Sequence, residues 1–312
     1  MKKRKLVALA GGVGAARFLR GLAAAGDPGN ITAIVNTADD FVHLGLHISP
    51  DIDTVCYTLA GLVDETSGWG LAGDTTACLE MLGRLDEETW FRLGDGDLAL
   101  HIKRTRLLGE GLPLSVVTRR ICAALGIETR VLPMTDDPIA TEIETPEGTI
   151  PFQDYFVRRA CRDTVRGVRF RGAETSRPSP GVLEAIGTAS AIIICPSNPF
   201  VSISPILSVP GIREAIISSD AAVAAVTPLI GGKTVKGPAD RMLRDLGHEA
   251  NAVGVAGLYE KLASAFILDT VDEAIRGDIE RLGMRVLVRD TLMSDTARAR
   301  DLAAAVVDFL DP

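Results

Sequence analysis

The sequence is short of basic residues, cysteine pairs and long apolar runs, and each shortage excludes a class of protein. There are 33 Lys and Arg against 41 Asp and Glu, a formal charge of -8, so we expect no nucleic-acid partner and no membrane partner. The five cysteines include no Cys-x-x-Cys pair, which argues against a disulfide framework and a structural zinc site. No apolar stretch approaches the roughly 18–20 residues of a membrane span. We therefore expect a cytoplasmic protein.

The common motifs of nucleophilic and zinc-dependent catalysis are also missing. The sequence contains no Gly-x-Ser-x-Gly and no His-Glu-x-x-His, and no cysteine stands beside a recognisable histidine signature. Its first glycine-rich segment lacks the Lys-Ser/Thr pair of a P-loop. These absences favour chemistry performed by positioning and a metal ion, as in phosphoryl transfer.

Apolar runs alternate with helical patterns along most of the chain. This alternation predicts an α/β fold of Rossmann-like type, with three αβα layers and a mostly parallel sheet. We expect strands over residues 5–10, 31–36, 129–134, 191–195, 221–227 and 284–288. We expect helices over residues 15–25, 53–63, 75–85, 115–125 and 297–310. Because no repeat or low-complexity linker interrupts the pattern, we expect residues 1–312 to form a single domain.

The stretch from about residue 139 to 180 differs from its surroundings. Residues 141–145 and 149–152 flank Pro-Glu-Gly, which predicts a β-hairpin, and six arginines follow between Arg158 and Arg171. We interpret the stretch as a small inserted α+β subdomain packed on the main sheet.

A glycine-rich turn, residues 11–14, directly follows the first predicted strand and precedes a helix. Glycines let the backbone approach a phosphate closely, and the free N–H groups of a helix start attract anions. Arg17 stands where a dinucleotide-binding motif has its third glycine, and a cation there opposes the helix dipole unless it meets an anion. We predict a phosphate site, although such turns also need glycine for structural reasons alone.

Four aspartates follow the second predicted strand, as the pairs Asp39-Asp40 and Asp51-x-Asp53. Ligands of parallel α/β sheets bind beyond the carboxyl ends of the strands, so carboxylates gathered there are suited to hold Mg²⁺. The alternative is that Asp51 and Asp53 only cap a helix that begins near Thr54.

Two nearby histidines have the spacing of a helical metal site. His43 and His47 are four residues apart, but Gly45 between them and Pro50 after them disfavour a helix. We therefore favour substrate contact or loop packing over zinc binding.

Three further segments combine polar side chains with loop-forming residues. Residues 91–101 mix arginine, glycine, aspartate and histidine and are predicted to form an ordered loop. Residues 195–205 follow a buried strand and supply serine and asparagine groups suited to a base, a ribose or a phosphate oxygen. A second glycine turn, residues 231–232, is followed by Lys233 and Lys236, which suit a phosphate charge.

Taken in order, these segments resemble the 2-phospho-L-lactate transferase family, which includes bacterial phosphoenolpyruvate transferases. The resemblance runs nearly end to end, through GGVGAARFLRGL, VNTADD, ISPDIDTVCYTLAG, RLGDGDLALHIKRT, PSNPFVSISPILSVPGIR, TPLIGGK and VKGPAD. It implies transfer of 2-phospho-L-lactate or phosphoenolpyruvate from a guanosine diphosphate-linked donor to a deazaflavin. The acceptor is the terminal ribityl hydroxyl of 7,8-didemethyl-8-hydroxy-5-deazariboflavin (Fo), GMP is released, and the step belongs to coenzyme F420 biosynthesis. Mg²⁺ as cofactor and a homodimer are implied as well.

Carried over residue by residue, the resemblance implies three sets of site residues. The deazaflavin contacts are Asp53, Arg92 and His47. The nucleotide and phosphate contacts are Gly12, Val13, Gly14, Arg17, Ser197, Asn198, Ser202 and Lys233. The catalytic and metal residues are Asp40 and Asp53, with Asp39, Asp51 and Asp95 as competitors for the metal.

Two other functions stay open at this point. One is a non-enzymatic regulator that binds a nucleotide sugar, from a related branch that shares the glycine turn and the Ser-Asn-Pro segment. The PDIDT and LGDGDLA segments count against it, because a sensor has no evident need for them. The other is an NAD-dependent oxidoreductase, which Arg17 disfavours, as does Asn36 where an acidic ribose contact is expected.

Overall fold

Seven parallel strands form the central sheet in the computed structural model, which describes residues 4–311. Their order is β14 (Arg285–Arg289), β13 (Ala265–Asp269), β10 (Ala222–Val226), β9 (Ala191–Ile194), β1 (Leu6–Ala10), β2 (Ile31–Val35) and β5 (Arg130–Pro133). Every neighbouring pair is parallel. The predicted α/β class and the six predicted strands are confirmed, whereas β13 was not predicted.

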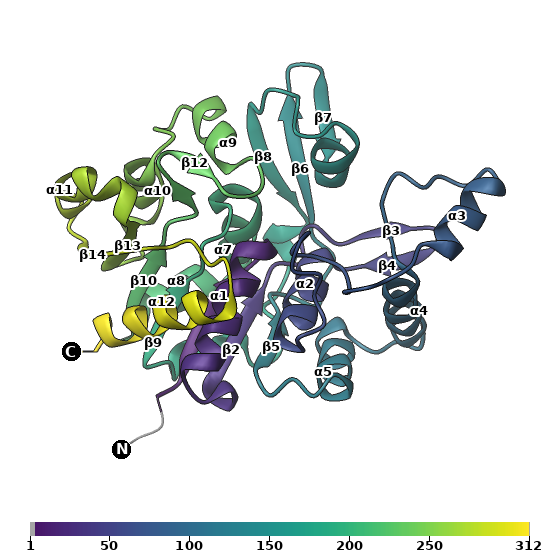
Figure 1. Cartoon of the computed structure of the whole chain (residues 1–312), viewed down its shortest axis with the longest axis horizontal. Helices are drawn as coiled ribbons and strands as arrows, with labels where there is room; N and C mark the ends of the chain where they lie inside the picture. The colour runs from purple at the N-terminus through teal and green to yellow at the C-terminus, as the bar shows by residue number, and fades with distance from the viewer. Residues whose placement is uncertain (1–3, 312) are drawn as a thin grey trace.

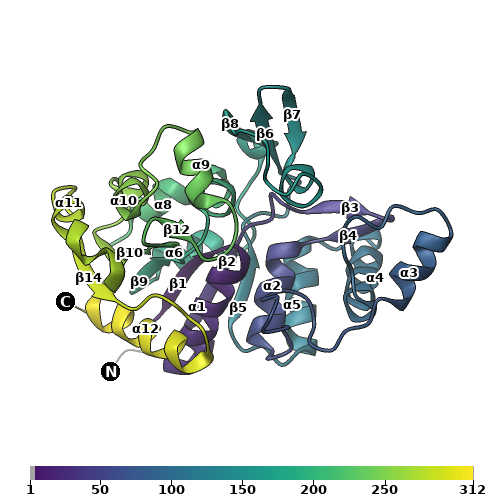
Figure 2. The ribbon, with the colours of Figure 1, turned by 45° about the horizontal axis from the view of Figure 1, so that its top comes forward.

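Helices cover both faces of this sheet, because alternate residues of each buried strand point to opposite sides (Figures 1 and 2). In β1, Leu6, Ala8 and Ala10 join one apolar cluster, and Val7 and Leu9 join the other. The first face is covered by α1 (Gly12–Ala25), α2 (Pro50–Leu59), α5 (Leu114–Ala124) and α12 (Thr296–Phe309). The second is covered by α6 (Val182–Gly187), α7 (Ser204–Ser208), α8 (Ile212–Ser218), α10 (Ala252–Tyr259) and α11 (Arg276–Glu280). The three predicted layers are confirmed.

The strand order reverses between β1 and β9. From β1 the chain builds outward through β2 to β5, then returns to β9 on the other side of β1 and builds outward to β14. The loops after β1 and β9 therefore diverge and leave a crevice at the carboxyl end of the sheet, which is where such folds bind ligands.

Two additions stand beyond this edge of the sheet. A long arm consists of the hairpin β3 (Phe41–His43) and β4 (Leu46–Ile48) with α3 (Ala77–Arg84) and α4 (Asp95–Gly109). Figure 2 shows it reaching away from the sheet on the side of α2. His43 and His47 thus lie on a hairpin, not on a helix.

The second addition falls within residues 139–180. The predicted hairpin is confirmed as β6 (Ala140–Thr145) and β7 (Gly148–Pro151), and β8 (Gly167–Arg171) adds a third antiparallel strand. Its apolar residues Ile143 and Tyr155 pack against Val201 and Met242, so it rests on the loop after β9 and on α9 (Ala239–Asp245). Figure 1 shows the three strands standing above the main sheet. A short hairpin of β11 (Leu229–Ile230) and β12 (Lys233–Thr234) lies before α9.

Within residues 4–311, no single helix has both the length and the apolar composition of a membrane crossing. One bent pair, Pro199–Ser208 with Ile212–Ser218, meets the criterion by length and composition only.

Candidate active site

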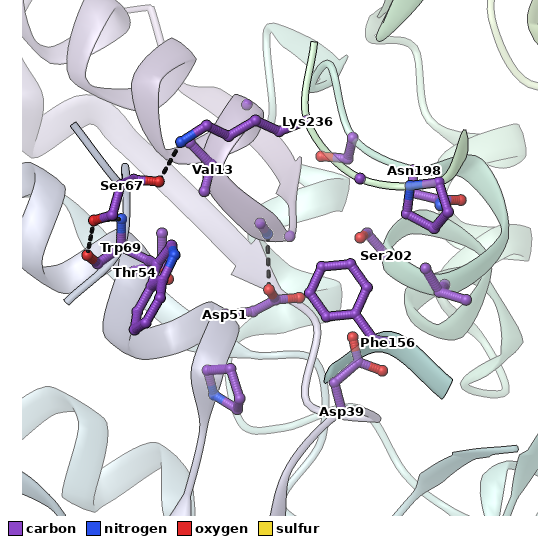
Figure 3. Close-up of a pocket in the computed structure, with 18 of the residues that line it drawn as sticks. Val13, Asp39, Asp51, Thr54, Ser67, Trp69, Phe156, Asn198, Ser202 and Lys236 are labelled. Carbon is purple, nitrogen blue, oxygen red and sulfur yellow. Dashed lines mark hydrogen bonds between the residues drawn. The ribbon is translucent and has the colours of Figure 1, made fainter. Parts of the chain in front are cut away.

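A cavity of about 750 Å³ occupies the crevice where the strand order reverses. Its size lies within the range of ligand pockets, about 300–1,000 Å³. Nine of the residues predicted from the sequence line it: Gly12, Val13, Gly14, Arg17, Asp53, Arg92, Ser197, Asn198 and Ser202. Three others lie outside its lining: Asp40, His47 and Lys233. Figure 3 shows the side chains converging from both sides of the crevice.

The glycine turn brings the first residues of α1 against the loop after β9. A Cβ at Gly14 would lie 2.3 Å from the carbonyl oxygen of Pro196, so only glycine permits this contact. The helix starts at Gly12, has no acidic residue in its first turn, and opens into the cavity. Its positive end attracts anions; the Gly12 N–H donates to Asp51 at 2.8 Å, and the N–H groups that follow it in the first turn have no partner within the helix.

The loop after β9 presents polar atoms to the same space. The Asn198 side chain accepts a hydrogen bond from the Phe200 backbone N–H at 2.9 Å, which fixes the turn that follows. The Ser197 Oγ is buried and has no hydrogen-bond partner within residues 4–311, although it belongs to the cavity lining. A buried hydroxyl without a partner is costly, so this atom is suited to a ligand oxygen.

Two buried carboxylates share one amide at the floor of the cavity. The Asn36 Nδ2, at the end of β2, donates to Asp39 Oδ2 at 3.0 Å and to Asp51 Oδ2 at 2.9 Å. Asp51 Oδ1 also accepts from the Gly12 N–H at 2.8 Å (Figure 3). Burial raises the pKa of Asp51 to about 6, and burial with the Asp51 charge raises the pKa of Asp39 well above its usual range. The pair therefore favours a shared proton or a bound cation.

The predicted metal ligands differ in their hydrogen bonds and in whether they line the cavity. Asp39 Oδ1 is buried without a hydrogen-bond partner in the described part of the chain, and both Asp39 and Asp51 line the cavity. Asp40 also has a buried Oδ1 without a partner in residues 4–311, but it lies outside the lining, and its Oδ2 accepts from Ser49 Oγ at 2.6 Å and His47 Nε2 at 3.1 Å. Asp95 accepts from Thr75 and from backbone N–H groups at the start of α3.

Among residues 4–311, no group of three His, Cys, Asp or Glu side chains is placed to hold a metal ion. Mg²⁺ is commonly held by one or two carboxylates together with substrate phosphates and water. Asp39 and Asp51 fit that donor set better than the predicted pair Asp40 and Asp53.

Asp53 forms a buried ion pair that the sequence did not predict. Both carboxylate oxygens accept from the Arg104 guanidinium, whose Nη1 lies 3.0 Å from Asp53 Oδ2, and Arg104 is fully buried. His101 Nδ1 lies 3.1 Å from Arg104 Nη1. Burial lowers the pKa of His101 to about 4, so the ring is neutral at pH 7 and its Nδ1 accepts from the guanidinium. Both oxygens of Asp53 thus bind a cation of the chain itself, and each keeps a second lone pair that can accept from a ligand.

The loop predicted over residues 91–101 is wrong beyond Gly94. Residues 95–109 form α4, because Asp97 accepts from the Gly94 backbone N–H at 3.1 Å and so caps the helix start. Asp97, His101 and Arg104 follow one another at helical spacing and are all buried on one face. That spacing is the signal in the sequence from which a helix could have been predicted here instead of a loop.

Aromatic side chains form a second part of the cavity. Its six members, called here the aromatic wall, are Tyr57, Trp69, Trp90, Phe91, Phe152 and Phe156. Phe152 and Phe156 stack with ring centroids 5.4 Å apart, and the Arg158 guanidinium lies 4.4 Å from the Trp90 ring centroid. Since aromatic residues make up only 4% of the chain, this concentration indicates a planar, apolar ligand.

The predicted histidine contacts have other partners. His43 packs among Phe41, Trp90 and Phe91, and burial lowers its pKa. His47 pairs with Asp40 beside the cavity. Its role as a deazaflavin contact stays a prediction.

The loop after β14 supplies lining residues that the sequence analysis did not single out as site residues. Thr291, Leu292 and Met293 line the cavity. Asp269, at the end of β13, accepts from the Thr291 N–H at 2.8 Å and from its hydroxyl at 2.7 Å, and so holds this loop in place.

The fold and site together define a Rossmann-like protein with an anion site and an aromatic site in one cavity. Comparison with known families matches residues 6–297 to the family described as 2-phospho-L-lactate transferase CofD. The chain belongs to this family.

Named relatives match over nearly their full length. A phosphoenolpyruvate transferase of Streptomyces griseus is 41% identical over 313 residues, covering 98% of each chain. A 2-phospho-L-lactate transferase of Methanosarcina mazei is 39% identical over 302 residues, covering 97% of this chain and 99% of the relative. Among solved structures, a UPF0052 family member from Bacillus halodurans aligns over 98% of this chain and 99% of its own. Its TM-score is 0.64 at 20% identity, a likeness that concerns the fold alone.

Proposed function

We propose that this protein transfers a phosphate-linked three-carbon acid from a guanosine diphosphate carrier to the deazaflavin Fo. The observation that carries the proposal is the single cavity in which a glycine turn at a helix start lies beside an aromatic wall. The glycine turn suits the diphosphate of a nucleotide, and the aromatic wall suits the planar ring of a deazaflavin. The names of the relatives agree with such a reaction.

In this reaction the terminal ribityl hydroxyl of Fo attacks the distal phosphorus of the donor. A new P–O bond forms, the bond from that phosphorus to the bridging oxygen of the diphosphate breaks, and GMP leaves with the bridging oxygen. The hydroxyl proton passes to solvent or to a cavity carboxylate. Because such transition states are loose, most of the catalysis comes from positioning and charge stabilisation.

The residues divide this work between them. The N–H groups that follow Gly12 at the start of α1, together with Arg17 and the buried Ser197 hydroxyl, would hold the diphosphate. Asp53, fixed by Arg104, is placed to accept a hydrogen bond from the deazaflavin. Arg92 lines the cavity from the arm and is the second proposed deazaflavin contact.

We further propose Mg²⁺ as the cofactor, held by Asp39 and Asp51. The argument rests on the two buried carboxylates that share Asn36 and on the unpaired Asp39 Oδ1. When bound, Mg²⁺ would neutralise charge on the donor phosphates. A homodimer and a cytoplasmic location stay predictions from the sequence.

The test is turnover with both candidate donors. Purified protein is incubated with Fo, Mg²⁺ and either lactyl-2-diphospho-5′-guanosine or its enolpyruvyl analogue, and the products are resolved by mass spectrometry. We expect one GMP per phospho-acid-linked deazaflavin, with a preference between the acids of about 10–200-fold at most, as for other small apolar differences. Nucleotide binding without any transfer to Fo would favour the regulator instead.

A further inference from the structure

Two cations, Arg17 and Lys236, flank the glycine turn. Arg17 donates to the carbonyl oxygens of Met293 at 3.3 Å and Glu65 at 3.2 Å. Lys236 donates to the carbonyl oxygens of Thr66, at 3.4 Å, and Ser67. Both line the cavity, and within residues 4–311 neither has a carboxylate at ion-pair distance.

The two positive charges act on one another. Burial lowers the pKa of Lys236, and the Arg17 charge lowers it further, against a smaller opposing effect of Asp64. The N-terminus of α1 adds partial positive charge at the same place. Like charges held together beside a helix start favour an anion between them.

Lys236 also joins two segments that are far apart in the sequence. Residues 64–70, called here the strap, form a closed turn in which Asp64 Oδ1 accepts from the Ser67 N–H at 2.8 Å and Gly70 O accepts from the Asp64 N–H at 3.0 Å. Figure 3 shows Lys236 reaching past Val13 to Ser67. The strap carries Trp69 of the aromatic wall.

The strap lies directly on the glycine turn. Gly68 has φ +73°, and a Cβ there would meet Val13 Cγ1 at 2.6 Å and Lys236 Nζ at 3.3 Å. Arg20 of α1 forms an ion pair with Glu65, which anchors the start of the strap. The strap is thus fixed to α1 at one end and to Lys236 in its middle.

We propose that Lys236 binds the donor diphosphate together with Arg17 and thereby holds the strap closed over the cavity. An ammonium group has three N–H donors. Two are directed to the carbonyls of Thr66 and Ser67, and the third is available for a phosphate oxygen. Donor binding and strap closure therefore stabilise each other. This inference rests on the proposed function, which supplies the nucleoside diphosphate.

Lys236 replaces Lys233 as the phosphate cation of this loop. Lys233 lies on β12 and does not line the cavity, whereas Lys236 does. The two lysines are three residues apart in the sequence, so the residue pattern alone did not separate them.

Calorimetric titrations with GDP, pyrophosphate and guanosine test the assignment at fixed Mg²⁺ and salt. The variants are Lys236→Met, Lys236→Arg and Lys233→Met, with Lys261→Met as a control at an exposed lysine outside the cavity. We expect Lys236→Met to weaken GDP and pyrophosphate binding about tenfold or more, as for loss of a charged hydrogen bond. Guanosine affinity should stay within about twofold, and Lys236→Arg should retain most of the GDP affinity. GDP should slow hydrogen exchange of amides 64–70 in the wild type but not in Lys236→Met.

The outcomes separate this inference from the proposed function. Wild-type GDP affinity in Lys236→Met, equal losses for guanosine and GDP, or a loss in Lys233→Met alone would each overturn the role of Lys236. If pyrophosphate binding depends on Lys236 but GDP is not preferred over UDP, the role of Lys236 stands and the guanosine donor is wrong. If the wild type binds no diphosphate, both are wrong.

Discussion

The two parts of the cavity are built in different ways. The strand-end loops, residues 11–14 and 196–202, are short continuous segments that emerge from neighbouring strands β1 and β9. The aromatic wall is gathered from α2, the strap, the segment before α4 and the insertion. The first part depends on backbone geometry, and the second depends on side chains that meet from separate segments.

This difference sets what holds each part in place. At the strand-end loops, close backbone contacts such as Gly14 against Pro196 fix the shape and leave little freedom. Behind the aromatic wall, the support is ionic: Arg104 on α4 holds Asp53 on α2, so one buried pair ties the arm to the main sheet. We therefore expect substitutions of the wall's own side chains to weaken binding with little loss of stability, and substitutions at the buried ion pair or at the loops to affect both together.

The largest effect is expected for Arg104→Met. Removing one member of a buried ion pair leaves the other charge uncompensated, which typically costs about 3–5 kcal/mol of unfolding free energy. Asp53→Asn should also abolish product formation, with a comparable cost to stability because the buried guanidinium loses its partner. Urea unfolding measures the unfolding free energy of each variant. The double variant should lose less than the sum of the two, and single variants within about 1 kcal/mol of wild type would contradict the pairing.

A smaller effect, of opposite sign, is expected for Asp51→Asn. The folded-state pKa of Asp51, about 6, exceeds the unfolded value of 3.8, so the folded protein binds more protons between these values. The stabilisation from this group is present below about pH 4 and lost as pH rises through 6, on the order of 2–3 kcal/mol. Relative to wild type, metal-free Asp51→Asn should therefore gain stability from pH 4.5 to 7.5, as measured by unfolding in EDTA. If the difference in unfolding free energy between Asp51→Asn and the wild type does not change with pH, the pKa of Asp51 is not raised in the folded protein.

Phe156→Ala tests the aromatic wall alone. The side chain is 40% exposed and lines the cavity, so its loss should leave the fold intact. We expect Fo to bind about tenfold more weakly, in line with the loss of an aromatic contact, and GDP to bind within about twofold of wild type. Fo fluorescence titrations measure the first affinity, and the exposed Leu183→Ala on α6 is the control. An equal loss of GDP affinity would mean that the aromatic wall and the strand-end loops do not bind their ligands independently.

The smallest effect is expected in the arginine-rich insertion. Arg169 pairs with Glu144 on the neighbouring strand, and its side chain is 70% exposed. Arg169→Ala should change the unfolding free energy by less than about 1 kcal/mol and turnover by less than about twofold. A tenfold loss of turnover would place this part of the insertion in the active site.

The contrast also explains what the sequence could predict. The sheet, the glycine turn and the loop after β9 follow from short patterns, since a buried strand ending in glycine or proline is recognisable locally. The Asp53–Arg104 pair is not, because its members are 51 residues apart and nothing local to either indicates the other. The metal candidates Asp39, Asp40, Asp51 and Asp53 are likewise equivalent in sequence, and only their surroundings in the fold distinguish them.

The central claim is that one cavity holds the nucleotide and the deazaflavin side by side. Fo fluorescence titrations of protein already saturated with GDP and Mg²⁺ test it most directly. The account predicts one Fo per chain with GDP still bound, and an Fo affinity no weaker than without the nucleotide. Competition, with Fo binding weakened in proportion to GDP concentration, would contradict it.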